Sequence, residues 1–264
     1  MAESTLALSY PDLREKVGFY QGYGRDTTLW TTPQSDDVED LLDSGYRQVL
    51  TPPLLQGQIR PHTWRFLRPT SQIVTVADKD DYDLPDDFAQ MDGNLIYVSN
   101  TTRGRVTITS ESAIRLNRSS DATSSGVPYL AATRPKRSDA ASGQRFEIMF
   151  WPTPDAAYTL QYRYAVQVNR LTTNNPWPLG GAQMAELLLE SCLAIAEHRM
   201  DDSVTGHHQA RFKELLAAAI DREARATAAE TVGYNGDPGA RVAWSPAGQH
   251  GWSPVTYEGV LYDG

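Results

Sequence analysis

The chain has 264 residues, of which 40% are hydrophobic, and a formal net charge of −9 at pH 7. This length and composition can bury the core of one large domain or two smaller ones, so we expect a globular protein. No run approaches the roughly 18 apolar residues that span a bilayer, and the first residues lack the features of a secretion signal, so we expect a soluble protein made in a cytoplasm.

Cysteine content and charge exclude several classes of protein. The single cysteine, Cys192, rules out an internal disulfide and a Cys-based zinc site within one chain. The negative net charge argues against nonspecific DNA coating, because phosphate affinity comes from Lys and Arg. The charge is uneven: residues 1–50 carry 4 basic and 9 acidic side chains, residues 101–150 carry 8 and 4, and residues 201–264 carry 5 and 9. This pattern is typical of solvated surface, or it allows copies to stack end to middle.

Two helices are predicted near the start of the chain. The first lies in "SYPDLREKVGFYQGYG", residues 9–24, where Ser9 can act as the N-cap and apolar residues share one face. The second lies in "SDDVEDLLDSGYRQVLTPP", residues 35–53. Ser35 is its predicted N-cap, acidic residues crowd the positive end of its dipole, and Pro52 ends it.

From about residue 62 the pattern changes to short runs rich in Thr, Val, Ile and Tyr, which is typical of strands. In the last run, Tyr158, Leu160, Tyr162 and Tyr164 alternate with smaller or polar residues, so their common face should be buried. Between residues 117 and 145, the runs "NRSSDATSSG" and "RPKRSDAASG" are polar and low in large apolar residues, so they are predicted as loops. The candidate strands suggest a β-sandwich or barrel-like module and comprise residues 64–67, 71–76, 81–84, 94–99, 105–110, 145–151 and 158–168.

Helical periodicity returns after the strands. Residues 180–200 are apolar on most of the helix circumference, which predicts a central helix, and residues 207–230 carry one apolar stripe that should pack against it. Residues 233–264 have no helical or strand period but hold two tryptophans and three tyrosines. An extended segment with large rings is suited to docking on a partner, although it can equally fold back on its own domain.

No arrangement of residues predicts a metal or cofactor site. The chain lacks the glycine-rich phosphate-binding motifs and the G-x-S-x-G motif of hydrolases. His198, His207 and His208 follow Glu190 and Glu197, but a ferritin-like site needs Glu-x-x-His on each of two helices and the spacing fails. We therefore expect no metal, no cofactor and no catalytic residues.

Two weaker candidates for chemistry remain. Asp155, in the "PTPD" turn among tyrosines, can be interpreted as the carboxylate of a carbohydrate-binding or hydrolytic β module, although a hairpin turn explains it better. Arg134, Lys136 and Arg137 form a basic patch that can contact nucleic acid. No aromatic residues interleave with this patch, so a solvated loop is favoured.

An ordered series of motifs resembles a known family. The segments "DLREKVGFYQGYGRD", "GYRQVLTPP", "WRFLRP", "YDLPDDFAQ", "GVPYLAA", "FWPTPDAAYTLQYRY" and "NRLTTNNPWPLGGAQMAELLLESCLAIAEHRM" occur in that order. Together they resemble the head-to-tail adaptor proteins of tailed bacteriophages, including the group related to podovirus tail tubular protein A. The resemblance extends over about residues 9–225.

The resemblance implies an α+β fold with three parts. Residues 1–60 and 172–230 would form a helical bundle, residues 61–171 an inserted antiparallel β-sandwich or barrel-like module, and residues 231–264 an extended C-terminal docking tail. It also implies a non-enzymatic virion protein that assembles as a ring of typically about twelve copies at the head–tail junction. Synthesis and assembly would take place in the cytoplasm of the bacterial host.

The same resemblance implies partners and a contact site. The ring would bind the portal above and a tail nozzle, stopper or tail-tube protein below, and it would help to retain the DNA that passes through its lumen without specific binding. The portal contact is expected at Trp244, Trp252, Tyr257 and Tyr262 in the tail. A stopper or tail-completion ring placed lower in the tail is the alternative.

Overall fold

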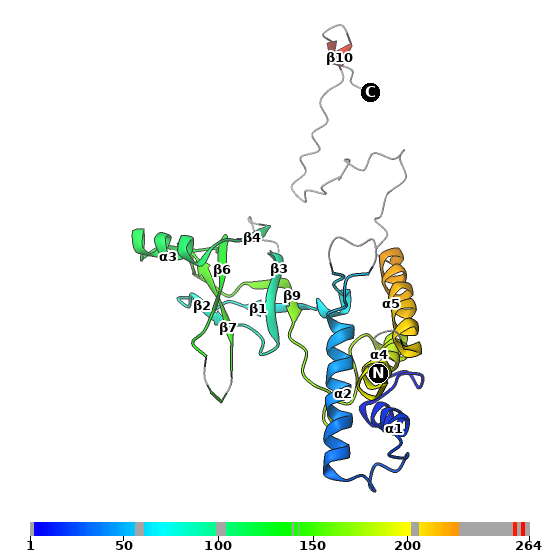
Figure 1. Ribbon diagram of the computed structural model, residues 1–264. Helices are drawn as coiled ribbons and strands as arrows, with labels where there is room; N and C mark the ends of the chain where they lie inside the picture. The colour runs from blue at the N-terminus through cyan, green and yellow to red at the C-terminus, as the bar shows by residue number, and fades with distance from the viewer. Residues whose placement is uncertain are drawn as a thin grey trace. The chain divides into compact units, whose positions relative to one another are not determined.

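The computed structural model describes residues 3–55, 61–98, 104–138, 140–141, 143–201 and 206–226, together with the backbone of two short strands within residues 256–261. The chain divides into two compact units, Met1–Thr227 and Ala228–Gly264. Within the first unit, four helices pack on one another and seven strands form a curled sheet that carries the remaining helix (Figure 1). The predicted α+β class is confirmed.

Both N-terminal helices begin with reciprocal capping. In α1 (Tyr10–Tyr20), Asp12 accepts a hydrogen bond from the backbone N–H of Ser9 at 2.9 Å, as expected for a helix capped there. In α2 (Thr32–Leu50), the equivalent pair is Thr31 and Gln34, also at 2.9 Å. The prediction of Ser35 as the N-cap is therefore wrong. Proline is accepted in the first turn of a helix, so α2 begins before Pro33 and takes Thr31 as its N-cap.

A buried helix, α4 (Ala185–Asp201), forms the centre of the bundle, as its apolar circumference predicts. It follows a short 3₁₀ helix, η2 (Gly181–Met184), and packs against α1, α2 and α5 (His207–Ala226). The core of the bundle also includes residues from the segments that enter and leave the sheet. Its members include Leu13, Leu41, Trp64, Leu171, Leu188 and Phe212.

The closest approach in the bundle lies between α2 and α4 at Gly45. A Cβ placed there would lie 2.9 Å from both the backbone N and the Cα of Cys192, so only a glycine fits. The hydroxyl of Ser191 donates to the carbonyl of Gly45 at 2.9 Å, while the side chain of Gln48 lies 3.1 Å from the same hydroxyl. Backbone contact and a buried hydrogen bond therefore fix this crossing.

The sheet is one curled, barrel-like layer with the strand order β1-β9-β3-β4-β6-β7-β2. β4 and β6 run parallel, whereas the other neighbours are antiparallel, so the sheet is mixed and not purely antiparallel as expected. Two further short strands, β5 (Ser125–Gly126) and β8 (Thr153–Pro154), pair with each other. The strands of the sheet are β1 (Thr70–Val74), β2 (Asp81–Asp83), β3 (Phe88–Tyr97), β4 (Arg105–Ile108), β6 (Leu130–Pro135), β7 (Phe146–Trp151) and β9 (Thr159–Val166).

The inner face of the sheet follows the predicted alternation. In β9, Leu160, Tyr162 and Tyr164 are buried, while Gln161 and Arg163 between them are exposed. The buried tyrosines join a cluster with residues of β2, β3 and β7, in which the ring of Tyr164 stacks on that of a phenylalanine in β3. This cluster is separate from the core of the bundle.

Two predictions about the β region are wrong. Residues 64–67 contain the 3₁₀ helix η1 (Arg65–Leu67) instead of a strand, because the indole of Trp64 donates to the carbonyl of Val49 at 2.6 Å and is buried in the bundle. The runs predicted as loops include the C-terminal end of the helix α3 (Glu111–Ser120) and the end of β6. Ser110 caps this helix, and its buried Ile114 packs on the sheet.

Replacement of Gly45 by alanine should destabilise the bundle, although alanine normally stabilises a helix interior. The added Cβ meets backbone atoms of Cys192, which cannot rotate away, so the free energy of unfolding should fall by about 1–3 kcal/mol. Thermal unfolding should show a lower Tm than that of the matched control, Ser44→Ala on the same helix. An unchanged or raised Tm would contradict the close crossing.

Candidate functional site

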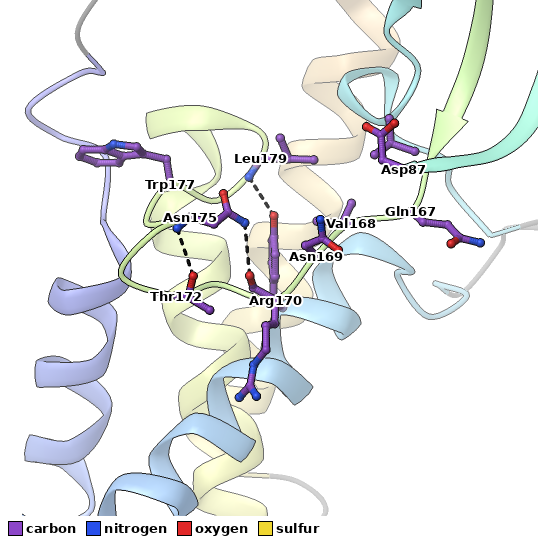
Figure 2. Close-up of a pocket in the computed structure, with 11 residues that line it drawn as sticks. Asp87, Gln167, Val168, Asn169, Arg170, Thr172, Asn175, Trp177 and Leu179 are labelled. Carbon is purple, nitrogen blue, oxygen red and sulfur yellow. Dashed lines mark hydrogen bonds between the residues drawn. The ribbon is translucent and has the colours of Figure 1, made fainter. Parts of the chain in front are cut away.

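A pocket of about 390 Å³ opens where the chain leaves β9 and returns to the bundle (Figure 2). It lies between a residue of α2 and the segment that connects the sheet to η2. The lining residues are Tyr46, Asp87, Val166, Gln167, Val168, Asn169, Arg170, Thr172, Asn175, Trp177 and Leu179.

Hydrogen bonds hold the loop of the pocket against the bundle. The hydroxyl of Tyr46 accepts from the backbone N–H of Leu179 at 3.0 Å (Figure 2). The side-chain amide of Asn175 donates to the carbonyl of Arg170 at 3.2 Å, and its backbone N–H donates to the hydroxyl of Thr172 at 3.1 Å. The sequence patterns did not identify this site, although the run "NNPWPLGG", with a tryptophan between two prolines, marks the loop.

The charged side chains that line the pocket interact with other residues of the chain. The guanidinium of Arg170 pairs with Glu39 at 3.3 Å and with Asp43 at 3.2 Å, both on α2. Asp87 accepts from the hydroxyl of Tyr164 at 3.1 Å. Because Asp87 is the sole carboxylate among the described lining residues and no nucleophile–base pair stands beside it, the pocket is suited to contact and not to acid–base chemistry.

The tyrosines near the pocket keep their protons at neutral pH. Burial, followed by the hydrogen bond to Asp87 and its charge, raises the pKa of Tyr164 to about 12. Burial also raises the pKa of Tyr46, against the opposing effect of the Leu179 N–H. Both hydroxyls therefore act as neutral hydrogen-bonding groups.

The histidines and glutamates considered for a metal site have structural roles. Glu197 accepts the backbone N–H groups of His207 and His208 at 2.9 and 3.0 Å, which caps the start of α5. Glu190 pairs with the ring of His208 at 2.8 Å and with Arg211 at 3.2 Å. Within the part of the chain that is described, no group of three His, Cys, Asp or Glu side chains could hold a metal ion.

Asp155 is a turn residue. It is exposed and accepts from the hydroxyl of Tyr158 at 2.7 Å. A sugar platform needs exposed ring faces, but Tyr162 and Tyr164 are buried in the inner face of the sheet. The arrangement therefore lacks the aromatic surface on which the carbohydrate interpretation depended.

The basic patch is largely paired within the chain. Arg134 contacts Glu147 at 2.5 Å and Asp81 at 2.9 Å, and Lys136 contacts Asp83 at 2.7 Å. Arg137, the third member, is exposed. Because carboxylates of the same chain neutralise two of its three cations, this patch offers little charge to nucleic acid.

Cys192 and Ser191 are buried in the helix crossing. Burial raises the pKa of the Cys192 thiol to about 12, so the reactive thiolate is scarce at neutral pH. The hydroxyl of Ser191 is bound to the carbonyl of Gly45. Both side chains stabilise packing.

The four tail residues predicted to contact a portal belong to the second unit. Trp244, Trp252 and Tyr262 lie outside the described residues. Tyr257 belongs to β10 (Thr256–Tyr257), which pairs with β11 (Val260–Leu261) in the second unit, and only the backbone is described there. Their role stays a prediction.

Comparison with known proteins identifies the family. The family described as SU10 adaptor protein matches residues 9–235, which is most of the chain, and the chain belongs to this family of phage head-to-tail adaptors. The predicted adaptor resemblance is confirmed, whereas the relation to podovirus tail tubular protein A stays a prediction. No curated protein sequence matches the chain. Among the described helices, none combines the length and apolar character needed to cross a membrane.

Stability should fall at alkaline pH as Tyr164 ionises. The pKa of about 12 in the folded chain lies above the ordinary tyrosine value of 10.0. The stability that Tyr164 contributes is therefore complete below about pH 10 and is lost as the pH rises towards 12. In Tyr164→Phe, unfolding free energy measured by urea titration should decline less over this interval. An equal decline in both proteins would contradict the assignment, and Asp87→Asn should lower the pH at which the tyrosine ionises.

Proposed function

We propose that the chain assembles into a ring of about twelve copies that joins the portal to the tail, extends the DNA channel and helps to retain packaged DNA. The observation that carries this proposal is the adaptor family match over residues 9–235, which includes both the bundle helices and the sheet. Family membership itself implies a structural phage head-to-tail adaptor, and hence a component of the virion.

The paired charges support a channel through which DNA slides. Arg118 and Arg134 both contact Asp81, at 2.8 and 2.9 Å, and Arg145 contacts Asp86 at 3.0 Å. Cations held in this way release few counterions from DNA, and the net charge of −9 repels phosphate. A lumen formed by such a surface retains DNA by its dimensions and by closure from below, and not by adhesion.

The C-terminal segment is proposed to attach the ring to the portal. Residues 228–264 form the second compact unit of the chain, and they contain Trp244, Trp252, Tyr257 and Tyr262. Large aromatic side chains supply much of the energy of protein interfaces. A tail nozzle, stopper or tail-tube protein would bind the opposite side of the ring, and assembly would take place in the host cytoplasm.

Assembly with the portal tests the ring. Light scattering of purified protein, alone and mixed with portal, should detect a complex with the mass of a closed ring. Electron microscopy of the complex should then fix the copy number and show the ring directly beneath the portal. A chain that stays monomeric with the portal would overturn the proposal, and a ring found lower in the particle would favour the stopper alternative.

Truncation after Glu230 should separate folding from attachment. The truncated chain should keep the Tm of the full chain, because the bundle and the sheet lie in the first unit. Portal binding should weaken by at least about tenfold, and Trp244→Ala or Trp252→Ala should each reproduce part of the loss. A truncated chain that unfolds would show instead that the aromatic residues belong to its core.

A further inference from the structure

The outer face of the sheet is covered over only part of its width. On β6 and β7, Ile114 of α3 packs against Ala132 and Met149 and shields them from solvent. At the other edge of the sheet, the neighbouring strands β1, β9 and β3 present the side chains of this same outer face to solvent. The same face therefore has a protected part and an open part.

The open part carries an apolar cluster, which we call the sheet patch: Val74, Val76, Ile96 and Val98. Each of these side chains is between 55% and 57% exposed. Val74 is paired with Thr159 across β1 and β9, and the N–H of Val98 donates to the carbonyl of Thr159, so the two valines flank one residue of β9. Four large apolar side chains gathered on a solvated sheet favour contact with another protein surface.

Positive charge surrounds the sheet patch. Arg105 is paired in register with Ile96, and this exposed cation has no carboxylate partner among the described residues. Arg68 and Arg163 share the single carboxylate of Asp92, at 3.3 and 3.9 Å, which leaves an excess of one positive charge. A partner for this face should combine apolar groups with acidic ones.

The bundle carries exposed residues of that composition near the link between α1 and α2, which we call the helix corner: Phe19, Leu29, Asp36 and Asp40. It lies at the end of α1, in the turn that follows and in the first three turns of α2. Leu29 is 79% exposed and Phe19 is 53% exposed. Asp36 and Asp40 are exposed, and neither has a cationic partner within the described chain. The helix corner and the sheet patch thus both carry apolar side chains, and the aspartates of the corner are opposite in charge to the arginines around the patch. Arg25, which lies over the ring of Phe19 at 4.4 Å, is paired with Glu15 at 2.9 Å.

We infer that the helix corner of one copy docks on the sheet patch of the next. The contact joins two different surfaces of identical chains, and a heterologous contact of this kind closes into a ring when its rotation divides a full turn. It buries the apolar side chains of both surfaces and pairs the aspartates with the arginines. The inference rests on the proposed ring and names the surfaces through which that ring is built.

Charge exchange tests the contact in the full-length chain. The corner variant combines Asp36→Lys with Asp40→Lys, and the patch variant combines Arg105→Glu with Arg163→Glu. Each variant should raise the protein concentration at half-assembly by at least about tenfold, because like charges then face each other. The chain that carries all four substitutions should assemble at nearly the original concentration, since the pairs are restored with exchanged signs.

Controls separate the contact from folding and from general charge. Arg222→Glu changes an exposed cation of α5 outside both surfaces and should leave assembly unchanged. The corner variant alone should assemble poorly while keeping the native Tm. A ring that tolerates both charge reversals, or a fourfold variant that is not rescued, overturns this contact and leaves the proposed function standing. A wild-type chain that remains monomeric with the portal overturns both.

Discussion

The crossing of α2 and α4 at Gly45 is the constraint on which the rest of the bundle depends. Because the two backbones touch there, the side chains on either side are confined to small or closely fitted groups, and Cys192 is sealed from solvent. The hydrogen bond from Ser191 satisfies a buried hydroxyl at the same point. With α4 fixed on α2, α1 and α5 have a defined surface on which to bury their apolar stripes.

The second organising interaction is the set of ion pairs on the sheet. The chain has a basic middle, and its surplus is neutralised largely by the acidic segment around β2: Arg118 and Arg134 meet on Asp81, and Lys136 on Asp83. Most of these basic residues are therefore not free to pair with the acidic ends of another copy, as one interpretation of the charge pattern requires. Cations that stay unmatched, such as Arg105, or that share one carboxylate, such as Arg68 and Arg163 on Asp92, are suited to contacts between chains.

The helices were predictable to the extent that many apolar residues repeat along them. α4 is buried around most of its surface, and β9 alternates cleanly, so both carry strong patterns. By contrast, α3 buries Ile114 alone, and a single apolar position cannot define a period. The run around Trp64 is rich in bulky residues typical of strands, yet the indole is held by a carbonyl of α2, a long-range contact that no local pattern contains.

The pocket was not predicted from the sequence, because its residues are also brought together by contacts between distant segments. Tyr46 shows as one more apolar member of a helical stripe, and its function as an acceptor for Leu179 depends on a loop far along the chain. Sequence motifs and the adaptor resemblance could be assessed from the sequence, because both depend on the order and spacing of residues along the chain. Contacts between distant segments, and surfaces such as the sheet patch, depend on register and burial and appear only in the folded chain.

The two connections of the sheet to the bundle suggest why an adaptor would have this architecture. The entering segment is held by the indole of Trp64 on α2 and by the backbone N–H of Arg65, which donates to Glu223 of α5 at 2.6 Å. The leaving segment is held by Arg170, which pairs with two acids of α2. Since both attachments include α2, a load applied to the sheet is passed to the bundle through several polar contacts at once. A part that joins a DNA-filled head to a tail must bear such a load without parting, and redundancy of this kind serves that purpose better than a single flexible link.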